Sequence, residues 1–279
     1  MTERDAGGKG VNISRALTAN QTENIALLVL GEKNAVDFCQ ALSVDGILSH
    51  NIIVPGRIRE NITIHTNDTE ETRISFAGFS ADESLLSLIS NTLDELLDNE
   101  SFVTFTGRVP DGIGMDAVKG FLMALKKRGV KIVVDSRSFE KQDLIDIKPW
   151  LIKPNQEEIS HYFGRNIQTQ EEALEAAQYL YHNGIENVMI SLGSRGALLV
   201  CQEGSFLAVP PQIDAISTIG AGDSSIAGFL VAAMNRKTSK EMLAMAVSYG
   251  SAACLQKGTR PPKSENIARL LSQVTVQRI

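Results

Sequence analysis

Residues 102–134 read FVTFTGRVPDGIGMDAVKGFLMALKKRGVKIVV, and this stretch decides the fold class. Residues 102–106 and 130–134 are short apolar runs, typical of strands that are covered on both faces. Residues 115–127 between them have the apolar spacing of a helix. A strand, a helix and a strand in this order predict two parallel strands joined by a right-handed crossover.

The same alternation runs along most of the 279-residue chain. It predicts one α/β domain over residues 1–279 with a mainly parallel central sheet. Further strands are expected at 25–30, 188–192 and 197–200, and further helices at 84–97, 171–181, 221–235, 239–256 and 264–273. Thr238 and Glu241 have the spacing of a capping box at the start of one of these helices.

Residues 51–79 break the rhythm, because they contain no helical pattern. Residues 62–66 and 73–76 alternate like strands and flank the polar turn 67–71, which predicts a β-hairpin inserted in the α/β chain. Two interpretations stay open for this insertion. It is either an extension of the main sheet's edge or a lid over a ligand crevice.

Composition excludes several classes of protein. The formal net charge of −6 disfavours a nonspecific nucleic-acid binder, which needs a basic face. Three distant cysteines and four histidines without zinc-site spacing predict reduced thiols and no zinc. The first residues are charged and the longest near-apolar run covers only residues 226–234, so we expect a cytoplasmic protein without a signal peptide or membrane span.

Two glycine-rich segments precede helices. In AGGKGVN at residues 6–12, Gly7, Gly8 and Gly10 let a backbone approach a ligand, and Lys9 adds a cation, although a plain turn would explain the glycines equally well. In STIGAGDS at residues 217–224, the glycines leave bare amide donors at a helix start beside Asp223. Such donors suit the charge of a phosphoryl group in transfer, whereas a dipole-favoured carboxylate alone would not require the glycines.

Three other segments have two interpretations each. Asn155 and Glu158 in KPNQEE form either a helix cap or a pair that positions magnesium through water. SLGSRG at residues 191–196 is either a tight hairpin or a nucleotide contact. The arginines of RIREN at residues 57–61 either grip a phosphate or lie in solvent.

Taken together and in this order, the motifs resemble the PfkB (ribokinase-like) sugar kinases over nearly the whole chain. The resemblance implies a three-layer α/β/α fold with a small β-hairpin lid at about 51–79. It is strongest to the branch that phosphorylates hexose monophosphates with ATP, and within that branch to kinases that convert fructose 1-phosphate to fructose 1,6-bisphosphate. Kinases of fructose 6-phosphate and tagatose 6-phosphate share every motif and remain alternatives.

The resemblance also implies a role for each matching residue. Asp223 would be the general base, and the amides of Gly220, Ala221 and Gly222 would hold the γ-phosphoryl group. Gly7, Gly8 and Asn12 would bind sugar hydroxyls, and Lys9, Arg59 and Arg108 the substrate's phosphate. Lys153, Asn155, Ser191 and Gly193 would line the ATP site, with Asn155 and Glu158 placing Mg²⁺. Backbone oxygens near Ser217, Ile219, Ala253 and Gly258 could hold K⁺, as in some relatives.

Two departures from the family pattern affect these expectations. Relatives normally begin with a strand and a sugar-binding Asp in an NPxxD-like run, and this chain starts just before GGKG, so we expect that first strand and part of the lid to be missing. An inactive sugar-phosphate-binding protein is therefore an alternative, and a non-kinase Rossmann-type binder is a weaker one. In the second departure, Arg108 stands where relatives often have a serine.

A homodimer formed through the lid is the expected assembly. Relatives often pair through this hairpin. The apolar side chains that would serve here are Ile52, Ile53, Ile58, Ile62 and Ile64.

Overall fold

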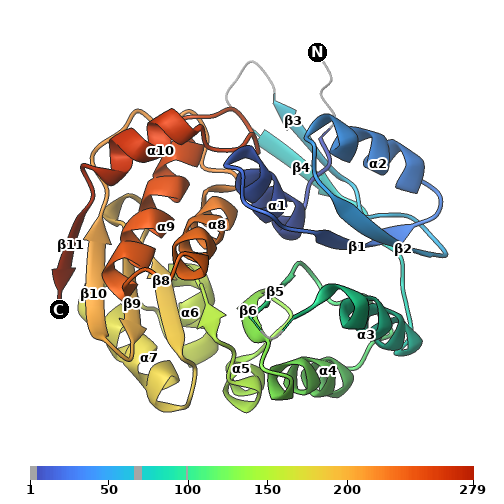
Figure 1. Ribbon diagram of the computed structural model, residues 1–279, viewed down its shortest axis with the longest axis horizontal. Helices are drawn as coiled ribbons and strands as arrows, with labels where there is room; N and C mark the ends of the chain where they lie inside the picture. The colour runs from blue at the N-terminus through green and yellow to red at the C-terminus, as the bar shows by residue number, and fades with distance from the viewer. Residues whose placement is uncertain (1–4, 66–70, 99) are drawn as a thin grey trace. The chain divides into compact units, whose positions relative to one another are not determined.

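The computed structural model describes residues 5–65, 71–98 and 100–279 (Figure 1). The chain divides into two compact units. The smaller unit contains residues 1–6, 25–96 and 109–121, and the larger unit contains residues 7–24, 97–108 and 122–279.

A seven-stranded mixed sheet forms the centre of the larger unit, in the order β11-β10-β9-β8-β7-β6-β5. Four neighbouring strands are parallel: β5 (Phe102–Thr106), β6 (Lys131–Asp135), β7 (Leu151–Ile152) and β8 (Asn187–Ser191). Three more continue the sheet in antiparallel pairs: β9 (Ala197–Cys201), β10 (Gly204–Val209) and β11 (Thr275–Arg278). The predicted parallel crossover is confirmed, and the antiparallel half arises because tight turns join β8 to β9 and β9 to β10.

Helices cover this sheet, so the larger unit has α/β/α layers (Figure 1). Helix α9 packs on β9 and β10, and α1, α8 and α10 lie next to it or to one another. Helices α6 and α7 pack on β8. The bounds are α1 Lys9–Ala19, α5 Lys141–Ile147, α6 Gln156–Phe163, α7 Gln170–His182, α8 Ala221–Met234, α9 Ser239–Cys254 and α10 Ser264–Leu271. Helix α4 (Met115–Lys127) is divided between the units, with residues 115–121 in the smaller one.

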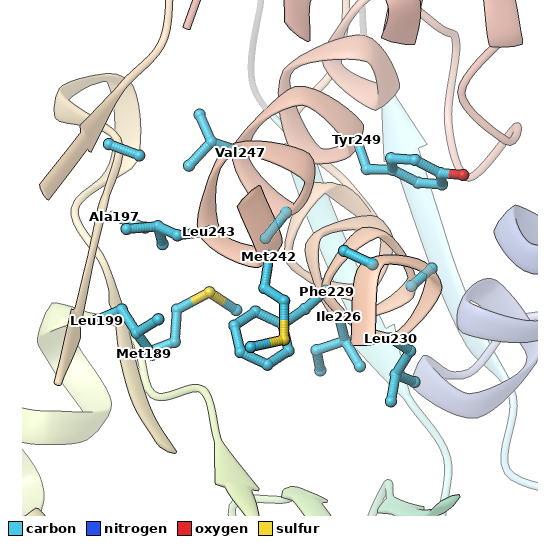
Figure 2. Packing of buried hydrophobic residues seen from close by; sticks show 14 of the residues in the cluster. Met189, Ala197, Leu199, Ile226, Phe229, Leu230, Met242, Leu243, Val247 and Tyr249 are labelled. Carbon is cyan, nitrogen blue, oxygen red and sulfur yellow. The ribbon is translucent and has the colours of Figure 1, made fainter. Parts of the chain in front are cut away.

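A cluster of buried hydrophobic residues lies between the sheet and helices α8 and α9 (Figure 2). Phe229 of α8 and Leu243 of α9 are fully buried there, together with Leu199 of β9. The two helices approach each other closely at Gly228, where an added Cβ would stand 2.6 Å from the backbone oxygen of Met245. This packing fixes the position of α8 against α9.

The smaller unit has two short sheets. Strands β1 (Ala26–Gly31) and β2 (Ser49–Val54) are parallel and are joined through α2 (Ala35–Val44). Strands β3 (Asn61–His65) and β4 (Glu71–Ser75) are antiparallel and confirm the predicted hairpin, although most of its turn lies outside the described residues. The hairpin is a sheet of its own, so the interpretation as an edge of the main sheet is wrong. Helix α3 (Ser84–Leu96) completes the unit.

No described helix has the length and apolar character needed to cross a membrane. The three cysteines are unpaired, as the sequence predicts.

Candidate functional site

The start of helix α8 is built around glycine. Gly220 is the N-cap in a left-handed conformation (φ 77°), and no side chain caps the helix. The first amides of a helix have no partner within it and lie at the positive end of its dipole. The Ala221 N–H donates to the Thr218 carbonyl at 3.3 Å, and Gly222 follows in the first turn. The predicted amide donors therefore lie at an uncapped helix start.

Asp223 lies in the first turn of α8 and is buried, with 8% of its surface exposed. Its Oδ2 accepts a 2.7 Å hydrogen bond from Nδ2 of Asn12. Burial raises the pKa of Asp223 above the ordinary aspartate value, and the Asn12 hydrogen bond opposes that rise. A carboxylate in this setting takes up a proton more readily than one in water.

The start of α1 brings the second glycine motif to the same place. Gly8 is its N-cap at φ 126°, a conformation that L side chains rarely adopt. An added Cβ on Gly10 would stand 2.9 Å from Oγ1 of Thr106 at the end of β5. These two glycines let α1 begin close to the sheet, which places Asn12 against Asp223.

Lys153 follows strand β7 and is 6% exposed. A Cβ added to Gly222 would stand 3.0 Å from the Lys153 ammonium nitrogen. A buried ammonium is costly unless negative charge lies nearby. This buried ammonium lies directly beside the start of α8, where a bound anion would offset the cost of burying its charge.

Lys9 joins two carboxylates at the site. Its Nζ lies 3.0 Å from Oδ1 of Asp135, the last residue of β6, and 4.0 Å from Oε1 of Glu158. The other oxygen of Asp135 is buried and has no hydrogen-bond partner among the residues that the structure describes. Sequence reasoning missed Asp135, although an acidic residue directly after the apolar run of β6 was a visible signal.

Asn155 and Glu158 form a complete capping box at the start of α6. The Glu158 N–H donates to Oδ1 of Asn155 at 2.8 Å, and the Asn155 N–H donates to Oε2 of Glu158 at 3.1 Å. The capping interpretation is thus confirmed. The second carboxylate oxygen of Glu158, Oε1, faces two cations. It accepts a 3.1 Å hydrogen bond from Nε of Arg137 and lies 4.0 Å from Nζ of Lys9.

The other nucleotide-side residues lie near this helix start. Ser191 pairs with Asn155 in a parallel bridge, and its N–H donates to the Pro154 carbonyl at 3.0 Å. Gly193 opens the 3₁₀ turn between β8 and β9 with φ 64°. The predicted hairpin is confirmed, and Ser191 stands at the carboxyl end of a parallel strand, where ligands of such sheets bind.

The four residues expected near potassium come from two segments. The N–H groups of Ile216 and Ser217 both donate to the Cys254 carbonyl at the end of α9. Ser217 is therefore close to Ala253, the neighbour of Cys254. Ile219 and Gly258 are exposed, and Gly258 has φ 59°.

Four expected substrate-binding residues are exposed: Gly7 and Gly8 at the start of α1, Arg108 after β5 and Arg59 in the smaller unit. Arg59 lies beside Gly78, where an added Cβ would stand 3.3 Å from its Cβ. Within the described ranges, no group of three or more His, Cys, Asp or Glu residues is placed to hold a metal ion.

Known proteins resemble the chain in sequence and fold. The model of the pfkB family carbohydrate kinases matches residues 2–266. The 1-phosphofructokinase of Vibrio cholerae is 30% identical over 98% of this chain and 86% of its own length. That of Haemophilus influenzae is 31% identical over 98% of this chain and 87% of its own.

Among solved structures, phosphofructokinase-2 from Escherichia coli in complex with potassium is 26% identical with a TM-score of 0.87. The match covers 96% of this chain and 87% of that one. The ribokinase-like fold that the motifs predict is thereby confirmed. The family match over residues 2–266 agrees with the two glycine-started helices that meet at buried Asp223, and the chain belongs to the pfkB family of carbohydrate kinases.

Proposed function

We propose that this kinase transfers the γ-phosphoryl group of ATP to a hydroxyl of a hexose monophosphate, with fructose 1-phosphate as its main substrate. The observation that carries the proposal is the junction of Asp223, Asn12 and Lys153 at the uncapped start of α8. It combines a base, its hydrogen-bond donor and a cation beside the backbone amides of a helix start that no side chain caps.

Asp223 is the general base of the proposed reaction. Its buried carboxylate has a raised pKa, so it is better suited than a solvated aspartate to accept the proton of the attacking hydroxyl. The hydrogen bond from Asn12 fixes Oδ2 and leaves Oδ1 for the substrate. Asn12, with Gly7 and Gly8, then lies where sugar hydroxyls would bind.

The start of α8 and Lys153 stabilise the transferred phosphoryl group. Positioning and electrostatic stabilisation supply most of the catalysis in such transfers. The amides of Gly220, Ala221 and Gly222 supply hydrogen-bond donors and Lys153 supplies charge. The Ala221 amide must exchange its 3.3 Å bond to Thr218 for the phosphoryl oxygen.

The residues present fit a magnesium ion carried with ATP. Magnesium keeps several waters and takes only one or two carboxylates in addition to nucleotide phosphates. Asp135 has an unpartnered buried oxygen, and Glu158 directs Oε1 toward the same lysine. These two carboxylates would hold the ion, Asn155 would keep Glu158 in place, and the bound ion would neutralise phosphate charge.

Charge on the substrate's own phosphate requires further cations. Lys9, Arg59 and Arg108 remain our predictions for this role. In the structure Nζ of Lys9 pairs with Asp135 at 3.0 Å. Lys9 can therefore bind the substrate's phosphate only if its side chain also reaches, or moves to, that phosphate. Ser191, Gly193 and Lys153 are proposed to line the ATP site, and Ser217, Ile219, Ala253 and Gly258 a potassium site.

Two features of the assembly belong to the same proposal. The hairpin β3–β4 acts as a lid, and two copies of the chain pair through it. Ile62 and Ile74 of the hairpin are 47% and 42% exposed, which supports an apolar contact surface. A scattering mass that stays monomeric at micromolar concentration would contradict the pairing.

The substrate is tested by coupled ADP release with the purified chain. Fructose 1-phosphate, fructose 6-phosphate and tagatose 6-phosphate are compared at equal concentrations with saturating Mg-ATP. We expect the highest kcat/KM for fructose 1-phosphate. A higher value for either other sugar reassigns the substrate, and ligand-dependent thermal stabilisation without any turnover would instead show a binding protein.

A further inference from the structure

Arg15 is a buried charged residue that none of the preceding steps uses. It lies on α1 one turn after Asn12, and only 5% of its surface is exposed. Arginine is rarely buried this deeply unless its donors are satisfied. Its Nη1 donates to Oδ1 of Asn12 at 2.8 Å and lies 3.4 Å from Oγ1 of Thr259.

The chemistry of arginine decides how the Asn12 amide is oriented. A guanidinium group has donors only, so the group that faces it must be the amide oxygen. The amide nitrogen of Asn12 then faces Asp223, whose ionised carboxylate has acceptors only. Turning the amide over would place oxygen against carboxylate and NH₂ against guanidinium, so both contacts would become repulsive.

We propose that Arg15 is a positioning residue for phosphoryl transfer: by fixing the Asn12 amide it presents an NH₂ donor to Asp223 and keeps the base in place. The inference rests on the proposed role of Asp223. Arg15 itself touches neither the sugar nor the nucleotide in this account. Its effect passes along the chain Arg15–Asn12–Asp223, with contacts of 2.8 and 2.7 Å.

The same relay affects the protonation of Asp223. The groups that act on this carboxyl are Asn12 and Lys9 of α1, Asp135 at the end of β6 and Lys153 after β7. Loss of Arg15 leaves the lysines and Asp135 unchanged but frees the amide to turn its oxygen toward Asp223. The acid limb of the kcat/KM profile should then move to higher pH.

The test is a double-mutant cycle of Arg15→Met and Asn12→Ala with kcat as its readout. Alone, Arg15→Met should lower kcat roughly 10- to 100-fold, the range for a hydrogen bond to a charged group. In the Asn12→Ala background it should lower kcat by less than about twofold, because the relay is already broken. An equal loss in both backgrounds would overturn the inference.

A conservative variant distinguishes loss of the proposed role from a folding defect. Arg15→Lys keeps a donor for the amide oxygen and should recover part of the lost kcat, with the KM for ATP nearly unchanged. If Arg15→Met does not fold, Arg15→Lys and Arg15→Gln replace it in the same cycle. A lysine variant as impaired as Arg15→Met would count against the inference.

Arg165→Met is the matched control, since it removes the same group from an exposed ion pair with Glu172 and Glu175. It should leave kcat and the pH profile unchanged.

A second measurement separates this inference from the proposed function. The ¹³C chemical shift of the Asp223 carboxyl can be titrated without any substrate. Its midpoint should lie at higher pH in Arg15→Met than in the wild type. An unchanged midpoint would overturn the role of Arg15 even if the enzyme is active, whereas a shifted midpoint without turnover of any sugar phosphate would overturn only the proposed function.

Discussion

Helices α6 and α8 of the larger unit both begin near the residues of the site, and they begin in opposite ways. The first amides of α6 are satisfied by its own capping box of Asn155 and Glu158. Helix α8 begins at Gly220 without a side-chain cap. A capped start is complete by itself, whereas an uncapped start keeps its donors for a ligand.

The starts of the other helices can be compared in the same way. Capping boxes also start α7 at Thr169 and α9 at Thr238. Helix α1 begins at Gly8 without a side-chain cap, as α8 does at Gly220. Asn12 of α1 and Asp223 of α8 are hydrogen-bonded, so the two glycine-started helices meet at the proposed site. Helices α2 and α10 also begin without a side-chain cap, so the feature that α1 and α8 share is a glycine at the N-cap.

The largest effect is expected from removing the base beside the uncapped start. Asp223→Asn keeps the size of the side chain and an acceptor for Asn12, but it cannot take up the proton. We expect kcat to fall roughly 10²- to 10⁴-fold, the usual contribution of a general base, with ATP affinity little changed. Turnover at the wild-type rate would remove Asp223 from the mechanism.

A smaller effect is expected from adding a methyl group at that start. The new Cβ in Gly222→Ala would stand 3.0 Å from the Lys153 nitrogen and would displace it. Small misplacements in a phosphoryl-transfer site can cost up to about 100-fold, so we expect kcat to fall by roughly 10- to 100-fold. Gly120→Ala is the control, because its added Cβ would meet no described atom within 4 Å other than those of its own residue, its chain neighbours and its helix backbone. Equal kcat in both variants would contradict the role of the α8 start.

The capped starts should respond differently. Asn155→Ala and Thr169→Ala each remove a cap and should each lower the free energy of unfolding by about 1 kcal/mol. Only Asn155→Ala should also raise the KM for Mg-ATP, because the Glu158 N–H loses its acceptor, Oδ1 of Asn155, at the helix start beside the proposed metal position. Urea unfolding and steady-state kinetics check the pair. A raised KM in Thr169→Ala would show that the cap's location has no bearing on nucleotide binding.

The smallest effect concerns stability. Burial raises the pKa of Asp223, so the folded protein holds this proton more tightly than the unfolded chain does. The ionised carboxyl therefore destabilises the fold at pH 8, and this cost disappears as the pH falls through the folded-state pKa. Asp223→Asn should melt at a higher temperature than the wild type at pH 8, with the difference shrinking on acidification. A variant that melts lower at pH 8 would contradict the burial argument.

The sequence predicted the fold well where local chemistry and periodicity agree. The crossover from β5 through α4 to β6, the hairpin β3–β4 and the cap at Thr238 all depend on neighbouring residues. It did not predict β10, although β10 pairs with the strand directly before it, β9. It also did not predict β11, whose partner β10 lies more than sixty residues earlier in the chain. Pairing over such distances leaves no local pattern.

The same reason explains what sequence reasoning missed at the site. Asp223 and Asn12 lie in recognisable glycine motifs, and the structure brings them together. Asp135 and Arg15 carry no motif of their own, and each matters through a contact with a residue from such a motif. Asp135 contacts Lys9 over 126 positions of sequence, and Arg15 looks like any polar residue on a helix until Asn12 and Asp223 are seen beside it.

The central claim is that the start of α8 holds the phosphoryl group while Asp223 takes the proton. A crystal structure with Mg-ADP, aluminium fluoride and fructose 1-phosphate tests it most directly. We expect the fluoride plane within hydrogen-bond distance of the amides of residues 220–222. We expect the attacking hydroxyl to be hydrogen-bonded to Oδ1 of Asp223, the oxygen that Asn12 does not contact. Aluminium fluoride bound away from these amides, or a sugar hydroxyl out of reach of Asp223, would contradict it.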